Sequence, residues 1–285
     1  MLPAFDSRNG HARGHNMKKL AEHKLLVRAS SRYIYAPFAP DDYGMVGFRY
    51  DRLPSAKSLR ILSLWPAQSG EPVQVSLETV PEAYVTNSLS GCQALSYVWG
   101  NTDRTTIITC NGKTLGITKN LYIALQAIRQ PDRETTLWAD AICIDQDNVE
   151  ERNEQIKLMA TIYSSAKRVL VWLGHSQDAE AAFSIANRMV EDFRLSRRVR
   201  LSSNRSELNY LRKISSCEWF NRMWTMQEIG LASEAIIMYG TARISWEQLY
   251  SVYSLFESQF SREMLMKFSF EPDRVTCFTI GVQQN

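Results

Sequence analysis

Four short apolar segments, separated by amphipathic stretches, constrain the fold of this chain more than any other feature of its sequence. They cover residues 94–98, 137–145, 167–174 and 234–240, and each is apolar at nearly every position. A strand with one side facing solvent alternates apolar and polar residues, whereas a strand covered on both faces is apolar almost throughout. The stretches between them carry apolar residues at helical spacing. This alternation predicts an α/β fold, an open parallel sheet with helices on both faces.

Antiparallel β-hairpins are predicted as additions near the start of this sheet. Residues 59–65 and 73–80 have strand-like patterns on either side of a turn-rich loop, which favours a hairpin. Asn111 and Gly112 separate two further strand-like runs, and this dipeptide suits a type I′ turn, in which both central residues have positive φ. Thr118 then stands where it can cap a helix.

The composition along the chain predicts three parts. Residues 1–51 are polar with scattered Gly, His and Pro, which indicates a poorly ordered lead-in. Residues 52–260 contain all the predicted strands and helices and form the folded domain. Residues 261–285 close no element that the pattern identifies, so we expect a C-terminal tail, with the chain a truncated piece of something longer.

Charge, hydropathy and cysteine usage exclude several classes of partner. The 33 basic and 30 acidic residues give a net charge of +3, so we expect no nucleic-acid partner, which would call for a clustered basic face. The sequence has no signal peptide and no apolar run of about 18 residues, so we expect a cytoplasmic protein without a membrane partner. Its five cysteines form no CxxC pair, so we expect neither a metal site nor a disulfide framework.

Ligands of open parallel sheets bind at the carboxyl ends of the strands, where the strand order reverses. The sequence lacks the nucleophile elbow, the dinucleotide fingerprint and the P-loop, so it matches none of the common sites at that edge. The candidate residues within or just after the first three buried segments are Ser96, Tyr97, Trp99, Gly100, Asn101, Asp140, Asp145, Gln146, Gly174 and His175.

Most of these candidates also have a structural interpretation. Asp140 lies within an apolar segment, so it needs an internal ion pair or a backbone hydrogen bond, and a catalytic role is the alternative. Asp145 and Gln146 either orient a ligand or complete the backbone of the next turn. Trp99 either packs in the core or stacks on a ligand ring. Cys143 is interpreted as a small buried apolar residue.

Glu228 is the sharpest candidate. A helix through residues 221–230 would place an apolar stripe against the core, with Glu228 along its edge; the stripe consists of Phe220, Met223, Trp224, Gln227 and Leu231. One interpretation is an ion pair with Arg222 or with a lysine elsewhere. The other is a carboxylate beside an indole in a partly apolar cleft, where a raised pKa makes it reactive or lets it bind a ribose hydroxyl.

Several motifs, in this order, resemble the heterokaryon incompatibility (HET) domain of filamentous fungi. They are CQALSYVWG, LWADAICIDQ, ERNEQIKLMATIYSSAKRVLVWLG and WFNRMWTMQEIGLASEAIIMYG. The resemblance extends over residues 59–246. One departure is visible, because the family usually has DAICINQ and this chain carries Asp145 in place of the asparagine. If that asparagine serves a ligand or a turn, a carboxylate there could weaken it.

The resemblance implies a cell-death effector in self/non-self recognition, which acts when genetically unlike hyphae fuse. Self-association or other incompatibility proteins would be its partners. The HET family is also remotely similar to TIR domains, which have a flavodoxin-like parallel sheet, and several TIR domains cleave NAD. Carried over, Glu228 is catalytic and Trp224, Tyr97, Trp99 and Gly100 line the pocket, with no resident cofactor and NAD as the substrate.

Three hypotheses about function therefore stand at this point. The first is an effector that hydrolyses NAD, with Glu228 stabilising positive charge as the glycosidic bond loosens. The second is a non-catalytic signalling module that acts by assembly, with a structural Glu228. The third is an inactive partial gene product.

Overall fold

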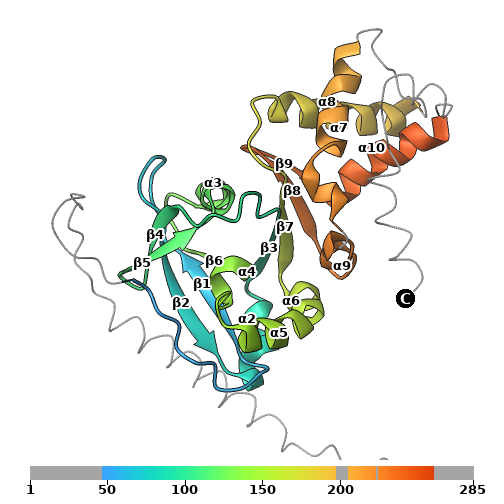
Figure 1. The fold of residues 1–285 in the computed structure, drawn as a ribbon. Coiled ribbons are helices and arrows are strands. Elements are labelled where there is room, and N and C mark those ends of the chain that lie inside the picture. Colours follow the sequence, from blue (N-terminus) through green and yellow to red (C-terminus); the bar gives the residue numbers. More distant parts are fainter. Residues whose placement is uncertain (1–46, 197–204, 223, 260–285) are drawn as a thin grey trace, which may run out of the picture. The chain divides into compact units, whose positions relative to one another are not determined.

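The computed structural model describes residues 47–196, 205–222 and 224–259, and the structural statements below concern this part of the chain (Figure 1). The strands are β1 (Leu59–Leu64), β2 (Gln74–Val80), β3 (Gln93–Tyr97), β4 (Thr106–Cys110), β5 (Lys113–Ile117), β6 (Thr135–Trp138), β7 (Arg168–Trp172), β8 (Ala235–Tyr239) and β9 (Ala242–Ser245). The helices are η2 (Glu82–Tyr84), α2 (Val85–Leu89), α3 (Lys119–Ile128), α4 (Asp140–Cys143), α5 (Val149–Lys157), α6 (Met159–Ser165), α7 (Ala179–Ser196), α8 (Arg205–Ser215), η3 (Glu218–Asn221), α9 (Trp224–Gly230) and α10 (Trp246–Gln259).

The strands form one mixed sheet in the order β5-β4-β2-β1-β6-β3-β7-β8-β9. Strands β6, β3, β7 and β8 are mutually parallel and form its centre. Numbered along the chain, these four lie in the order 2-1-3-4, which is the flavodoxin-like order. The strand order reverses between β3 and β7, where Tyr97 pairs with Trp172. The predicted α/β fold is confirmed.

Both faces of this parallel centre are covered. The last four residues of β3 and the last four of β7 are all buried. Successive side chains of a strand point to opposite faces, so consecutive burial means that neither face meets solvent. The same property produced the continuous apolar segments in the sequence.

The predicted hairpins are also present. β1 pairs with β2 and β4 pairs with β5, both antiparallel. At the β4–β5 turn Asn111 has φ 50° and Gly112 has φ 75°, as a type I′ turn requires. Thr118 caps α3 by accepting a hydrogen bond from the Leu121 backbone N–H.

The second apolar segment was predicted as one strand over residues 137–145, and this is wrong. The strand ends at Trp138, and residues 140–143 form the helical turn α4. The backbone N–H of Cys143 bonds to the Ala139 carbonyl, so the chain turns inward without leaving the core. A short apolar run does not distinguish a buried strand from a buried helical turn. Cys143 is buried as expected, but in a helix.

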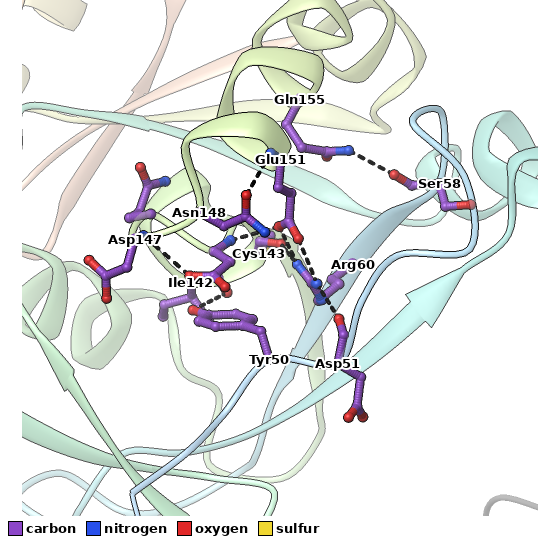
Figure 2. Close-up of polar contacts among 12 residues, drawn as sticks. Tyr50, Asp51, Ser58, Arg60, Ile142, Cys143, Asp147, Asn148, Glu151 and Gln155 are labelled. Atoms are coloured by element: carbon purple, nitrogen blue, oxygen red, sulfur yellow. Dashed lines mark hydrogen bonds and ion pairs between the residues drawn. The ribbon is translucent and has the colours of Figure 1, made fainter.

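A buried ion pair joins β1 to α5 (Figure 2). The Arg60 side chain is 3% exposed and that of Glu151 is 9% exposed, and two N···O distances of 2.6 and 3.0 Å join them. Arg60 also donates to the carbonyls of Asp51 and Cys143, and Glu151 accepts from the Asp145 backbone N–H. The pair therefore fixes the C-terminal end of α4 and the residue pair that follows it.

Residues 47–51 were predicted as the end of the lead-in, and the structure gives them contacts. The Phe48 backbone N–H donates to the Thr114 carbonyl at 2.8 Å. The Tyr50 hydroxyl donates to the Ile142 carbonyl at 2.9 Å (Figure 2). The rest of the predicted lead-in and the predicted tail, residues 261–285, lie outside the described residues. Within the described ranges, no helix combines the length and apolarity that crossing a bilayer demands.

Candidate functional site

The site is built around Glu228, whose carboxylate lies against the end of β3. The Trp219 indole donates to Ser96 Oγ at 2.7 Å, and Ser96 Oγ in turn donates to Glu228 Oε2. The side chains come from η3, β3 and α9, and Glu228 is only 4% exposed. We call this group the Trp219–Ser96–Glu228 chain. It lies beside the point where the strand order reverses, the position at which sheets of this kind bind ligands.

Arg222 supplies positive charge to this centre from the connection between η3 and α9. Its guanidinium donates to the Tyr97 backbone carbonyl at the end of β3. The described contacts include no direct ion pair between Arg222 and Glu228. The guanidinium nevertheless lowers the pKa of the Glu228 carboxyl through space, so the predicted pairing takes the form of an electrostatic contact.

Asp140 is a second carboxylate in the same region, and it is half-buried. The Trp99 indole donates to its Oδ2 at 2.9 Å, and the Ala141 backbone N–H donates to its Oδ1 at 2.7 Å. The predicted backbone hydrogen bond of Asp140 is thereby confirmed. The buried Tyr97 hydroxyl has no partner with hydrogen-bond geometry among the described residues, although it acts on the pKa of Asp140.

Burial dominates the protonation of both carboxyls. Desolvation raises the pKa of Glu228 above its ordinary value, against the lowering effects of the Ser96 hydrogen bond and the Arg222 charge. Asp140 adds a further small increase to the pKa of Glu228 because two like charges repel. Desolvation likewise raises the pKa of Asp140. Acids with a perturbed pKa beside a strand end are a feature of functional sites.

The predicted apolar stripe of the Glu228 helix is wrong. Helix α9 covers Trp224–Gly230, and Phe220 belongs to the separate turn η3, so Phe220 and Trp224 do not share one helical face. Met223 lies outside the described residues. The inward face instead carries Thr225, Glu228 and Ile229, while Trp224 is 57% exposed. The structure therefore separates Trp224 from the buried environment of Glu228.

The other predicted pocket residues lie around the end of β3. Tyr97 is buried in the strand. Trp99 is half-buried with its indole N–H engaged by Asp140. Gly100 is exposed with φ 67°, a left-handed conformation that favours glycine. Their proposed role in binding stays a prediction.

The loop after α4 uses its polar side chains to complete the turn. Asp145 Oδ1 accepts from the Asp147 backbone N–H at 3.2 Å, and the Gln146 amide donates to the Asp140 carbonyl at 2.8 Å. This confirms the turn interpretation of both residues. An asparagine at position 145 has an oxygen that accepts the same bond, so Asp145 preserves this turn.

Asn120 is a polar residue at this edge that the sequence analysis missed. Its amide donates to the Val98 carbonyl at 2.6 Å, and its Oδ1 accepts from the Trp172 indole at 3.0 Å. It therefore ties the end of β3 to the end of β7. Trp219 was also missed, although a buried indole N–H needs an acceptor and so signals a polar partner.

One hollow lies away from this centre. It has a volume of about 580 Å³ and lies between residues 52–56 and the first turns of α5. Glu151 and Gln155 are among its lining residues, and none of the residues of the Glu228 centre lines it. In the described part of the chain, no cluster of three or more His, Cys, Asp or Glu side chains could hold a metal ion.

Comparison with known proteins identifies the segment that contains this centre. Residues 93–228 match the family described as heterokaryon incompatibility protein (HET). This segment resembles a HET domain. The match begins at β3 and ends at Glu228, so the segment includes both ends of the Trp219–Ser96–Glu228 chain.

A curated relative of this chain is heterokaryon incompatibility protein 6, OR allele, of Neurospora crassa. The two are 29% identical over a match that covers 53% of this chain and 29% of the relative. The chain therefore spans less than a third of the relative's length. No solved structure matches this chain significantly.

Proposed function

We propose that this chain acts in fungal heterokaryon incompatibility as a cell-death effector whose HET domain hydrolyses NAD. The HET match and the incompatibility relative support the biological role. The observation that carries the chemical role is the buried Glu228 carboxylate, held by Ser96 at the strand-order reversal of a flavodoxin-like sheet. We place this activity in the cytoplasm, with self-association or other incompatibility proteins as partners.

The proposed reaction cleaves the bond between nicotinamide and its ribose. As that bond breaks, the electron pair leaves with nicotinamide and positive charge develops on the ribose carbon. Ionised Glu228 would stabilise this charge, and a water molecule would then bond to the carbon and release a proton. A carboxylate in a buried setting is more effective here than one in water, because the low dielectric strengthens its field.

Substrate access sets a condition on this proposal. At 4% exposure, Glu228 meets a nucleotide only if the segments around it move apart. We therefore expect NAD cleavage to depend on self-association of the chain, and to be measurable at high protein concentration.

The same low exposure favours a second candidate, a non-catalytic module that signals by assembly. In that case the Trp219–Ser96–Glu228 chain would fasten η3 and α9 to β3. Glu228 would then contribute to stability and not to chemistry.

Glu228→Gln separates the two candidates. Glutamine keeps the volume and an oxygen that accepts from Ser96, but it cannot carry the charge. The concentrated full chain is incubated with NAD, and nicotinamide release is measured for the parent, for Glu228→Gln and for the control Glu150→Gln, which changes an exposed carboxylate. We expect Glu228→Gln to lose at least about 100-fold in rate, as is usual when one stabilising group is removed, while the control keeps the parent rate.

Intact NAD in the concentrated parent, together with a toxic Glu228→Gln variant in cells, would remove the enzymatic proposal and leave the assembly module. A parent that neither cleaves NAD nor kills cells would support the third hypothesis, an inactive partial product.

A further inference from the structure

We infer that Ser96 is a positioning residue for Glu228: the Trp219 indole fixes its hydroxyl so that Oε2 is engaged and Oε1 is the oxygen that meets a ligand. The hydrogen-bond chain itself is independent of any activity. Its consequence for catalysis depends on the proposed function above.

The direction of the hydrogen bonds in the Trp219–Ser96–Glu228 chain follows from the chemistry of the three side chains. An indole N–H can only donate, so at 2.7 Å the Ser96 Oγ must be the acceptor. A serine hydroxyl carries a single hydrogen, which then points to the nearby Glu228 Oε2. If the bond were reversed, with a protonated Oε2 donating to Ser96 Oγ, the serine hydrogen would need another acceptor. The described contacts of Ser96 Oγ offer none, and such a loss is unfavourable.

This direction distinguishes the two oxygens of the carboxyl. Oε2 accepts from Ser96 in both protonation states, so the proton of the neutral acid belongs on Oε1. The described contacts give Oε1 no hydrogen bond. The groups that face Glu228 electrostatically are Arg222 from the η3–α9 connection, Asp140 from α4 and the Tyr163 hydroxyl from α6. Oε1 is therefore the oxygen that would approach a developing cation.

Titration of Glu228 tests the hydrogen bonds of the Trp219–Ser96–Glu228 chain without any assay of activity. Carboxyl ¹³C shifts are followed against pH in glutamate-labelled full chain, with Glu228→Gln identifying the signal. The variants are Ser96→Ala, which removes the donor, Ser96→Thr, which keeps a hydroxyl, and Trp219→Phe. Trp138→Phe is the matched control, because Trp138 is also fully buried and its indole nitrogen has no partner among the described residues.

We expect Ser96→Ala to tighten proton binding at Glu228 on the order of tenfold, since the ionised form loses a hydrogen bond to its charge. Ser96→Thr should restore the parent titration. Trp219→Phe should raise proton affinity by less than Ser96→Ala, and Trp138→Phe should leave it unchanged.

Two results would overturn the inference. One is a folded Ser96→Ala variant with the parent titration of Glu228. The other is a Trp219→Phe variant in which Glu228 titrates as it does in Trp138→Phe, which would mean that the Trp219 indole does not hold the Ser96 hydroxyl. If Ser96→Ala fails to fold, the comparison of Trp219→Phe with Trp138→Phe still tests the inference. If the parent protein does not cleave NAD, the proposed function is contradicted, but the expected titrations of Glu228 are unchanged. If NAD is cleaved, Ser96→Ala should lower kcat and move the acidic limb of the pH profile upward.

Discussion

At the scale of single residues, the molecule is distinguished by carboxylates placed where water is scarce. Glu228 is buried and Asp140 is half-buried, and both carboxyls have raised pKa values. Hydrogen bonds from Ser96 and Trp99 compensate part of the cost of burial. A fold that keeps two such groups near one strand end gives up stability at neutral pH, which is common at functional sites.

The first prediction concerns the pH dependence of stability. Because the pKa of Glu228 is raised in the fold, the folded state binds more protons than the unfolded state above the ordinary value of 4.5. The free energy of unfolding therefore falls as pH rises from that value through the folded pKa. Glu228→Gln lacks this loss, so its Tm relative to the parent should increase between about pH 4.5 and pH 7. Thermal unfolding across this range measures it, and a Tm difference that stays flat would contradict the raised pKa.

The identity of Glu228 as a special residue could be predicted from the sequence, but its surroundings could not. A lone carboxylate among Trp224, Met226 and Ile229 signals a partner. The identity of that partner depends on which side of the helix faces inward. The inward face carries Thr225, Glu228 and Ile229, one position along from the predicted stripe. Ser96 was a candidate because it lies near the end of a buried strand, but its hydrogen bond to a residue 132 positions away has no local signal in the sequence.

At the scale of secondary-structure elements, the apolar pattern of the sequence predicts the parallel centre of the sheet, but it does not predict the side-chain contacts that join one element to another. Continuous apolar runs predicted β3, β7 and β8 because both faces are covered. The same rule failed at α4, where an apolar turn has the composition of a strand. The tie between β1 and α5 needed Arg60 and Glu151, 91 positions apart, and neither shows its partner in the sequence.

The second prediction tests that tie. Glu151→Ala leaves Arg60 buried without its counter-ion and should lower the free energy of unfolding by about 3–5 kcal/mol. Arg60→Met combined with Glu151→Leu removes both charges and should recover much of this loss. Urea unfolding of the single and double variants measures both values. A single variant as stable as Glu154→Ala, whose carboxylate is partly exposed and paired with Lys157, would contradict the account.

The third prediction tests the β4–β5 turn. Gly112 has φ 75° and open space around its Cβ position, so Gly112→Ala introduces backbone strain without a clash. We expect a loss of roughly 1–2 kcal/mol in the free energy of unfolding. Gly47→Ala is the matched control, because Gly47 has the same open space without a positive φ. Equal stability of the two variants would show that the turn does not require glycine.

At the scale of the whole molecule, the domain resembles part of a larger incompatibility protein. The match to the Neurospora crassa relative covers 29% of that protein. Assembly is the step that would reconcile a carboxylate exposed by 4% with an activity on a nucleotide. We therefore expect any NAD cleavage to increase more steeply than linearly with protein concentration, which rates measured over a dilution series would establish.

The most direct measurement expresses the full chain and its Glu228→Gln variant in a fungal host and follows viability and NAD content in the same cultures. The account predicts that NAD falls before viability in the parent, and that the folded variant preserves both. Cell death at constant NAD in the parent, or equal death and equal NAD loss with Glu228→Gln, would contradict it.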